Sequence, residues 1–115
     1  MKTYYSLRIA ASENHYNKIS ELLGVIPNNN DNGWMYEVIE GKNDPHFNFI
    51  KEFTTIIEGK MKELHSLGIR KEDITVWMIY EYEGQCNMEF HPEDMWSLCK
   101  HGISLCVSCY EAGQG

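Results

Sequence analysis

The stretch ITVWMIYEY, residues 74–82, decides the fold of this chain. β-branched and aromatic residues dominate it, and these residues favour strands. Successive side chains of a strand point to opposite faces, so Val76 belongs to one face while Trp77 and Ile79 belong to the other. Both faces are partly apolar, which is typical of an interior strand. We therefore expect a central strand whose Val76 face packs against helices and whose Trp77 and Ile79 face stays open or meets a partner.

Glycine followed by a β-branched residue ends three helix-like stretches around this strand. The three places are residues 23–25, 67–69 and 101–103. Glycine adopts the left-handed conformation easily just past a last helical turn, and an apolar residue after it packs back on the helix. This pattern predicts helices over about 12–23, 44–67 and 92–101.

Further strands are predicted on both sides of the central one, at about 3–10, 34–40, 86–90 and 103–110. Glu83-Gly84 is expected to turn the central strand back into the 86–90 strand as a hairpin. The element order is then β-α-β-α-β-β-α-β, and its last six elements follow the ferredoxin-like pattern. The sequence thus predicts an α+β two-layer sandwich, in which three helices cover one face of a mostly antiparallel sheet of about five strands. We expect a single domain over 1–110 and a flexible tail over 111–115.

Composition and charge narrow the class of protein. The 115 residues are 43% hydrophobic, and 10 Lys and Arg residues stand against 17 Asp and Glu residues, a formal net charge of -7. A nucleic acid would bind against its own phosphate charge, so we expect no nucleic-acid partner. No apolar run is long enough to cross a bilayer, and Met1 leads directly into strand-like sequence, so we expect no membrane partner and a cytoplasmic location.

The distribution of acidic residues is the feature that points to a function. Between Lys71 and Lys100 there is no Lys or Arg, whereas seven Asp and Glu residues fall in this interval. Such an electronegative edge could attract a basic protein partner and speed its association. Together with the open sheet face, it gives these partner-binding candidates: Trp77, Ile79, Glu81, Glu83, Glu89, Glu93 and Asp94. An acidic surface that only keeps the protein in solution is the alternative, and the open sheet face could also serve a homodimer.

Four cysteines raise the alternative of a metal or redox role. Cys106-x-x-Cys109 has the spacing of a zinc knuckle, but both residues fall in a predicted strand, where residues three apart point to opposite faces. Cys86 and Cys99 occupy apolar positions, which favours small buried side chains, whereas Cys106 lies on the polar face and could be a reactive thiol.

No arrangement of residues in the sequence indicates catalysis. Cysteine and histidine side chains lack a third orienting group, and single glycines form no phosphate-binding loop. We therefore expect a protein that is not an enzyme and that has no cofactor and no metal site. A small-molecule cleft near the asparagine-rich loop at 28–34 is the remaining alternative.

Two sections of the chain resemble a known family. The first is Leu23-Gly24-Val25-Ile26-Pro27, followed by a polar loop and Gly33-Trp34. The second is an apolar hairpin, a short helix that ends Leu98-x-x-x-Gly102-Ile103, and the strand from 104 to 110. In this order they resemble the small bacterial domain-of-unknown-function family number four-two-seven-nine, although the loop before Trp34 is short and the last strand is rich in cysteine. The resemblance implies a bacterial protein with no established catalytic site, and an immunity-type role against toxins for some members.

Overall fold

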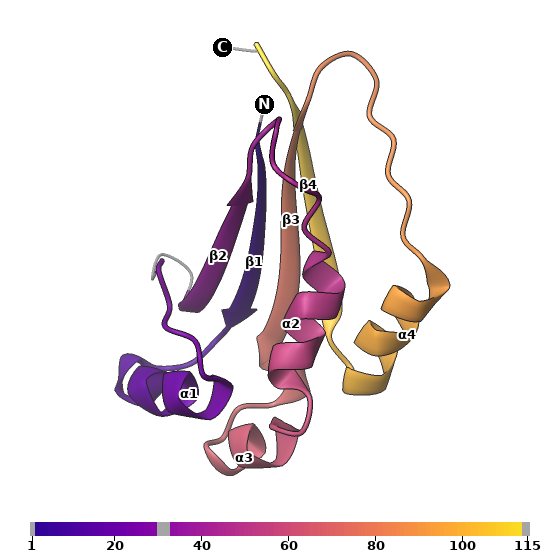
Figure 1. Cartoon of the computed structure of the whole chain (residues 1–115). Helices are drawn as coiled ribbons and strands as arrows, with labels where there is room; N and C mark the ends of the chain where they lie inside the picture. Colours follow the sequence, from indigo (N-terminus) through magenta and orange to yellow (C-terminus); the bar gives the residue numbers. More distant parts are fainter. Residues whose placement is uncertain (1, 30–32, 114–115) are drawn as a thin grey trace.

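β3 (Ile74–Tyr82) lies inside a mixed sheet whose strand order is β2-β1-β3-β4. The computed structural model describes residues 2–29 and 33–113, and within them the other strands are β1 (Thr3–Ile9), β2 (Trp34–Glu40) and β4 (Ser104–Glu111). The helices of the same residues are α1 (Tyr16–Leu23), α2 (Phe49–Ile57), α3 (Met61–Ser66) and α4 (Pro92–His101), with short 3₁₀ turns η1 (Glu13–His15) and η2 (Lys71–Asp73). α2 covers the sheet, α1 and α3 lie at one end of it, and α4 flanks α2 (Figure 1). The α+β class and the interior position of β3 are confirmed.

Of the three strand pairings in the described residues, two are antiparallel, in line with the expected mostly antiparallel sheet, and the third makes the sheet mixed. β1 is antiparallel to β2 and to β3, but β4 is parallel to β3. Four strands are present among the described residues, so the sheet has one strand fewer than expected. α4 is the crossover that joins β3 to β4, and parallel neighbours need such a connection.

The predicted strand at 86–90 is wrong, and so are the hairpin that it would form with β3 and the ferredoxin-like order of the last six elements, because β3 is followed directly by α4. Residues 85–91 are extended but pair with no strand. The reason lies in β3, whose two edges are already paired, one with β1 and the other with β4. A returning strand therefore has no free edge on β3, and the segment passes out to the start of α4 (Figure 1).

The long helix predicted over 44–67 is two helices, so four α-helices stand where three were expected in the described chain. α2 begins later than the predicted start at 44, because Asn48 is its N-cap and accepts a hydrogen bond from the Lys51 backbone N–H at 3.3 Å. α2 ends at Ile57, and Gly59 follows with φ of +78°. This left-handed residue turns the chain, so that α3 contacts α1 and buries Leu64.

The predicted glycine stops of the first and last helices are confirmed. Gly24 and Gly102 follow α1 and α4 with φ of +73° and +67°. After Gly102, the Ile103 N–H donates to the Leu98 carbonyl at 3.0 Å, which satisfies a free carbonyl of the last turn. Ile103 is buried, so the cap also packs β4 back on α4.

The core fills the space between the sheet and the helices, on the face predicted from alternation. Leu7 and Val76 are fully buried, and the half-buried Leu105 packs against the same cluster. Phe53 of α2 lies at its centre, and its ring contacts those of Phe49, Phe47 and Tyr36 at centroid distances of 6.5, 5.7 and 6.2 Å.

The opposite face of the sheet is only partly open. The Arg8 guanidinium lies 4.3 Å from the centroid of the Trp77 ring, and the Trp77 indole N–H donates to the Thr75 hydroxyl at 3.1 Å. Trp77 and Ile79 are half-buried even without a helical layer. A cation–π contact therefore occupies part of the surface on which a partner was expected.

The end of the chain continues the sheet. Glu111 is the last residue of β4, and the Ala112 N–H donates to the Tyr82 carbonyl. The tail expected at 111–115 thus falls partly on β4, and residues 114 and 115 lie outside the described residues. Among the helices described, none has the length and apolar character needed to cross a bilayer.

Candidate functional site

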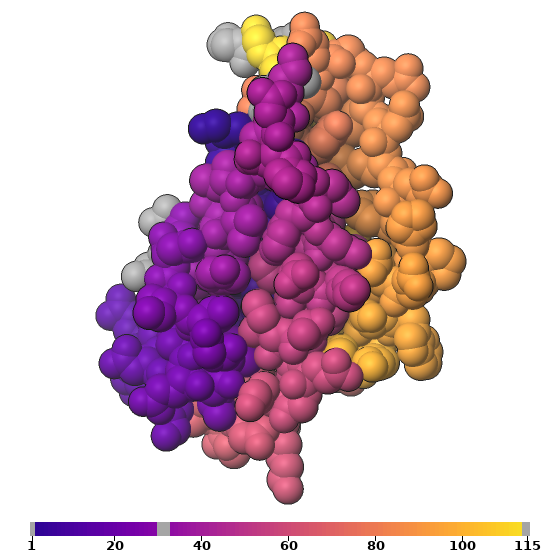
Figure 2. All heavy atoms as spheres, viewed as in Figure 1, coloured from indigo at the N-terminus to yellow at the C-terminus, as the bar shows by residue number. Residues whose placement is uncertain are grey.

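A pocket lies at the end of the sheet where β1 begins and β2 and β3 finish. Its cavity volume is about 470 Å³. One side is formed by the strand ends and the start of α2, and the other by the extended 87–91 segment and the first turn of α4. Seen from the helical side, the surface of α2 borders that of the 83–101 segment (Figure 2). Sequence-distant parts of the chain therefore meet at one pocket.

Aromatic rings form the deep part of this pocket. Tyr5 and Phe49 are buried and stack at a centroid distance of 4.7 Å with an interplanar angle of 26°. Tyr80 and Phe90 are half-buried and also line the pocket. Half-buried rings leave part of their surface available to a bound group.

The Glu40 carboxylate is fixed in place by hydrogen bonds at the edge of the pocket. Its side chain is 18% exposed, and it accepts hydrogen bonds from the Phe47 backbone N–H and, at 3.3 Å, from the Tyr5 hydroxyl. His46 Nδ1 lies 3.6 Å from the same carboxylate. Burial raises the pKa of the Tyr5 phenol above its ordinary value, and the nearby Glu40 charge adds to this rise. Tyr5 thus remains a protonated donor to Glu40.

The raised pKa of Tyr5 makes stability sensitive to alkaline pH. Above the ordinary tyrosine pKa of about 10, the unfolded chain loses a proton that the folded state keeps, so stability falls as pH rises. Tyr5→Phe removes this proton and should reduce the fall between about pH 9 and pH 11 by about 1 kcal/mol. Urea unfolding of both proteins across this range measures the difference. Parallel pH profiles for the two proteins would contradict the role of the buried phenol.

Two further carboxylates line the pocket, and no Lys or Arg in the described part of the chain neutralises them. Asp94 is in the first turn of α4 and Glu89 is on the segment before it, and both line the pocket. Among the ion pairs and hydrogen bonds of the described residues, none engages either carboxylate. The described lining contains His46 and His91 but no Lys or Arg. The pocket therefore presents a negative potential to solvent.

Two smaller hollows continue the pocket on either side. One, of about 300 Å³, shares Asn48 and Asp94 with it and adds Lys51, Glu93 and Ser97 between α2 and α4. The other, of about 220 Å³, lies around the turn after β2 and shares Glu40, His46, Thr3 and Tyr80 with the pocket. We call the three hollows together the acidic groove. The acidic residues that line it are Glu40, Asp44, Glu81, Glu89, Glu93 and Asp94, and the Lys residues that line it are Lys42 and Lys51.

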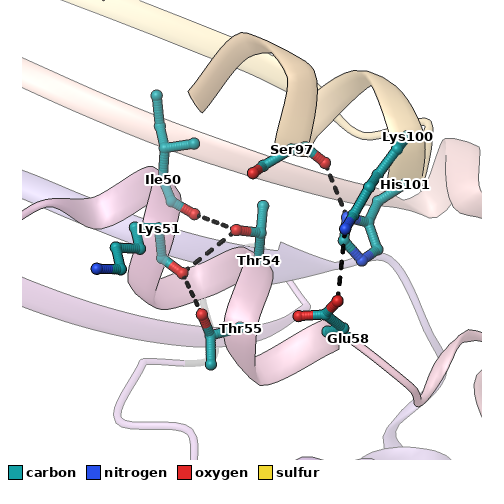
Figure 3. A network of polar contacts seen from close by, with 8 residues as sticks. All are labelled: Ile50, Lys51, Thr54, Thr55, Glu58, Ser97, Lys100 and His101. Atoms are coloured by element: carbon teal, nitrogen blue, oxygen red, sulfur yellow. Dashed lines mark hydrogen bonds and ion pairs between the residues drawn. The ribbon is translucent and has the colours of Figure 1, made fainter. Parts of the chain in front are cut away.

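Contacts between α2 and α4 hold one wall of the acidic groove. The Lys100 ammonium lies 3.4 Å from the Glu58 carboxylate at the far ends of the two helices (Figure 3). This pair is exposed and contributes little stability. Burial of Phe53 and Leu98 beneath the helices contributes more, because removing a large apolar side chain from water stabilises the fold by about 1.5–3 kcal/mol.

The predicted partner-binding residues divide between two faces. Glu89, Glu93 and Asp94 line the acidic groove, and Glu81 borders the hollow around the turn after β2. By strand alternation the Glu81 side chain belongs to the face of Trp77 and Ile79, where its carboxylate accepts from the Tyr110 hydroxyl at 3.2 Å. Glu83 is exposed on the turn beyond β3 and lines none of the three hollows. The two apolar candidates, Trp77 and Ile79, lie on the opposite face of the sheet. The structure therefore does not form one surface from all seven.

Sequence reasoning missed the residues that the N-terminal half contributes. Glu40, His46 and Tyr5 belong to β2, the following loop and β1, far along the chain from the acidic interval. Asp44-Pro45 has the sequence of a helix start, with an N-cap residue and a first-turn proline, so the sequence predicts a helix there. In the structure these residues belong to the loop after β2, and Asp44 and His46 line the groove. The only sequence signal for this half of the groove is the charged Glu40 at the end of a predicted strand.

The four cysteines do not gather at one place. Cys106 lies opposite Trp77 on the outer face of the sheet, and Cys109 is on the inner face, as strand alternation predicts. Cys86 neighbours Cys109, and burial, followed by the effect of that thiol, raises the pKa of Cys86. The expectation that Cys86 and Cys99 are buried is wrong, since Cys99 is exposed and Cys86 half-buried. Within the described residues, no group of three His, Cys, Asp or Glu side chains is placed to hold a metal ion.

In the loop at 28–34, the described residues 28, 29, 33 and 34 line none of the three hollows. Trp34 is fully buried and its indole N–H donates to the Ser20 hydroxyl at 3.0 Å. The Asn28 side chain pairs with the backbone N–H and carbonyl of Glu37 at 2.8 and 2.9 Å. Residues 30–32 lie outside the described residues. The described ends of this loop are thus engaged with β2 and α1.

Comparisons with known proteins find no family model, no curated protein and no solved structure that matches this chain. The resemblance to family number four-two-seven-nine stays a prediction that rests on the residues quoted for it. The acidic groove is therefore the main basis on which a function can be proposed.

Proposed function

We propose that this protein is a non-enzymatic interaction domain that binds a basic segment of a partner protein in the acidic groove. The observation that supports this most is the pair of carboxylates on Glu89 and Asp94, which line the central pocket without an ion pair among the described residues. An uncompensated carboxylate beside low-dielectric protein attracts a cation more strongly than one in open water.

The arrangement of the groove favours a segment of protein as its ligand. Three adjoining hollows share lining residues, so an extended chain could place successive side chains in them. Negative charge on this scale speeds the approach of a basic partner and disfavours acidic ones. The proposal keeps the acidic candidates Glu89, Glu93 and Asp94 and assigns no role to Glu81, Trp77 or Ile79, whose side chains share the opposite face of the sheet.

A small cationic molecule is the second candidate. The central pocket, at about 470 Å³, falls within the range of about 300–1,000 Å³ that is usual for small-ligand sites. Such a ligand would occupy the central pocket and leave the two flanking hollows empty.

The wider role proposed with this binding is that of a bacterial cytoplasmic protein, of the immunity type that the family resemblance implies. A basic toxin surface would be a suitable partner for the acidic groove. The location rests on the sequence expectation, and the partner rests on the resemblance and on the charge of the groove.

Salt dependence tests the proposed electrostatic binding. The probe is a fluorescein-labelled peptide with one central arginine between two pairs of lysines, which we call the arginine peptide. Raising NaCl from about 0.05 to about 0.5 M should weaken its binding about tenfold or more, because screening shortens the reach of exposed charges. Fluorescence anisotropy measures the affinity, and a neutral glycine-serine peptide is the control. Absence of binding, or an affinity independent of salt, would overturn the proposal.

A further inference from the structure

We infer that the central pocket of the acidic groove receives a single arginine side chain of the partner, and prefers arginine to lysine. This inference rests on the proposed function and deepens it, because it names the side chain that the 470 Å³ pocket recognises. Three properties of the pocket support it: the placement of its carboxylates, its aromatic lining, and the engagement of this chain's own arginines elsewhere.

The carboxylates stand on different elements around the pocket. Glu40 belongs to β2, whereas Asp94 belongs to α4 and Glu89 to the segment before it. A guanidinium carries five N–H donors in a planar fork and can pair with more than one carboxylate at once. An ammonium is a compact, strongly hydrated charge without this fork. A pocket with acids on separate elements therefore suits a guanidinium.

The rings beside the carboxylates favour the same group. Tyr80 and Phe90 are half-buried pocket residues, and a guanidinium stacks on aromatic faces while its edge donates hydrogen bonds. The folded chain already contains such a contact, since Arg8 lies over the Trp77 ring on the other face of the sheet.

Neither arginine of this chain is available to fill the pocket. The sequence contains two, Arg8 and Arg70. Arg8 lies on Trp77 and donates to the Ser6 hydroxyl at 3.0 Å, and Arg70 lies 3.7 Å from the Asp73 carboxylate. The arginine must therefore come from another molecule.

Two peptides and two matched variants test this inference. The arginine peptide is compared with a lysine peptide that differs only in its central residue, by fluorescence anisotropy at one salt concentration. The wild-type protein should bind the arginine peptide about tenfold more tightly, the difference expected for charge-assisted bonds that a lysine cannot reproduce. Asp94→Asn should remove this preference. Glu83→Gln, which neutralises an exposed carboxylate outside the groove, should retain it. Circular dichroism checks that both variants are folded.

The outcomes separate this inference from the proposed function. Equal affinity for both peptides, or a preference that Asp94→Asn leaves intact, would overturn the arginine pocket and leave the basic partner standing. Failure of both peptides to bind would overturn both. Agmatine, a free guanidinium compound, is the third probe. If it binds as tightly as the arginine peptide, the protein source of the guanidinium is contradicted.

Discussion

Replacing Phe53 by alanine should lower the free energy of unfolding by about 3–5 kcal/mol, the range found for truncation of a buried aromatic residue. Phe53 is fully buried at the centre of α2, and three other rings surround it. α2 has no room to move toward the sheet, because Phe49 and Ile57 on the same helix are also buried. The cavity would therefore persist. Urea unfolding followed by circular dichroism measures the loss.

The matched control for this substitution is Thr55→Ala on the same helix. Thr55 is exposed, and its hydroxyl donates to the Lys51 carbonyl at 2.7 Å, a bond that water can replace. Its effect should stay below about 0.5 kcal/mol, as is usual for exposed positions. If Phe53→Ala changed stability no more than Thr55→Ala, the packing of α2 on the sheet would be wrong.

Reversing two charges of the acidic groove should weaken binding of the arginine peptide at least about a hundredfold. The double variant is Glu89→Lys with Asp94→Lys, and both residues line the central pocket. Each change removes an attraction and adds a repulsion, and bringing like charges together at an interface costs several kcal/mol. Glu89 is exposed and Asp94 is half-buried at the start of α4, so a lysine at either position can extend into solvent without disturbing the core.

A second double variant separates the groove from the charge of the whole protein. Glu13→Lys with Glu63→Lys changes the net charge by the same amount, but these exposed residues lie on η1 and α3, at the other end of the molecule (Figure 1). Only the general attraction should fall, by about threefold at moderate salt, because distant exposed charges are largely screened. Equal loss in the two double variants would show that the peptide responds to net charge and would contradict a localised site.

The sheet shows which parts of the fold are predictable from local sequence. The alternation in 74–82 predicts β3 with its bounds and its buried Val76 face, because side-chain parity is a property of the strand itself. The strand predicted at 86–90 fails for a non-local reason. Whether that segment can pair depends on which strand takes the free edge of β3, and β4, which follows α4 in the chain, takes it.

The apolar spacing of the sequence continues across the break between α2 and α3, so it does not predict the break. Ile57, Met61 and Leu64 continue the spacing of a single apolar stripe, so periodicity predicts an uninterrupted helix. The cost of Gly59 in a helix is about 1 kcal/mol. α3 instead contacts α1 and buries Leu64, and no local pattern reports such a contact.

The candidate site is half predictable for a similar reason. The acidic interval is contiguous in sequence, so charge alone identifies Glu89, Glu93 and Asp94. Glu40 and the aromatic lining from Tyr5 and Phe49 join them only through the fold. Conversely, Trp77 lies close in sequence to the acidic residues but on the other face of the sheet.

Mapping where the arginine peptide binds tests the acidic groove most directly. Titration of the peptide into ¹⁵N-labelled protein, followed by backbone amide NMR, reports contacts residue by residue. We predict the largest shifts at Glu40, Glu89 and Asp94, which line the central pocket from both sides. Largest shifts at Trp77 and Ile79, or no saturable shifts at all, would contradict the acidic groove as the binding site.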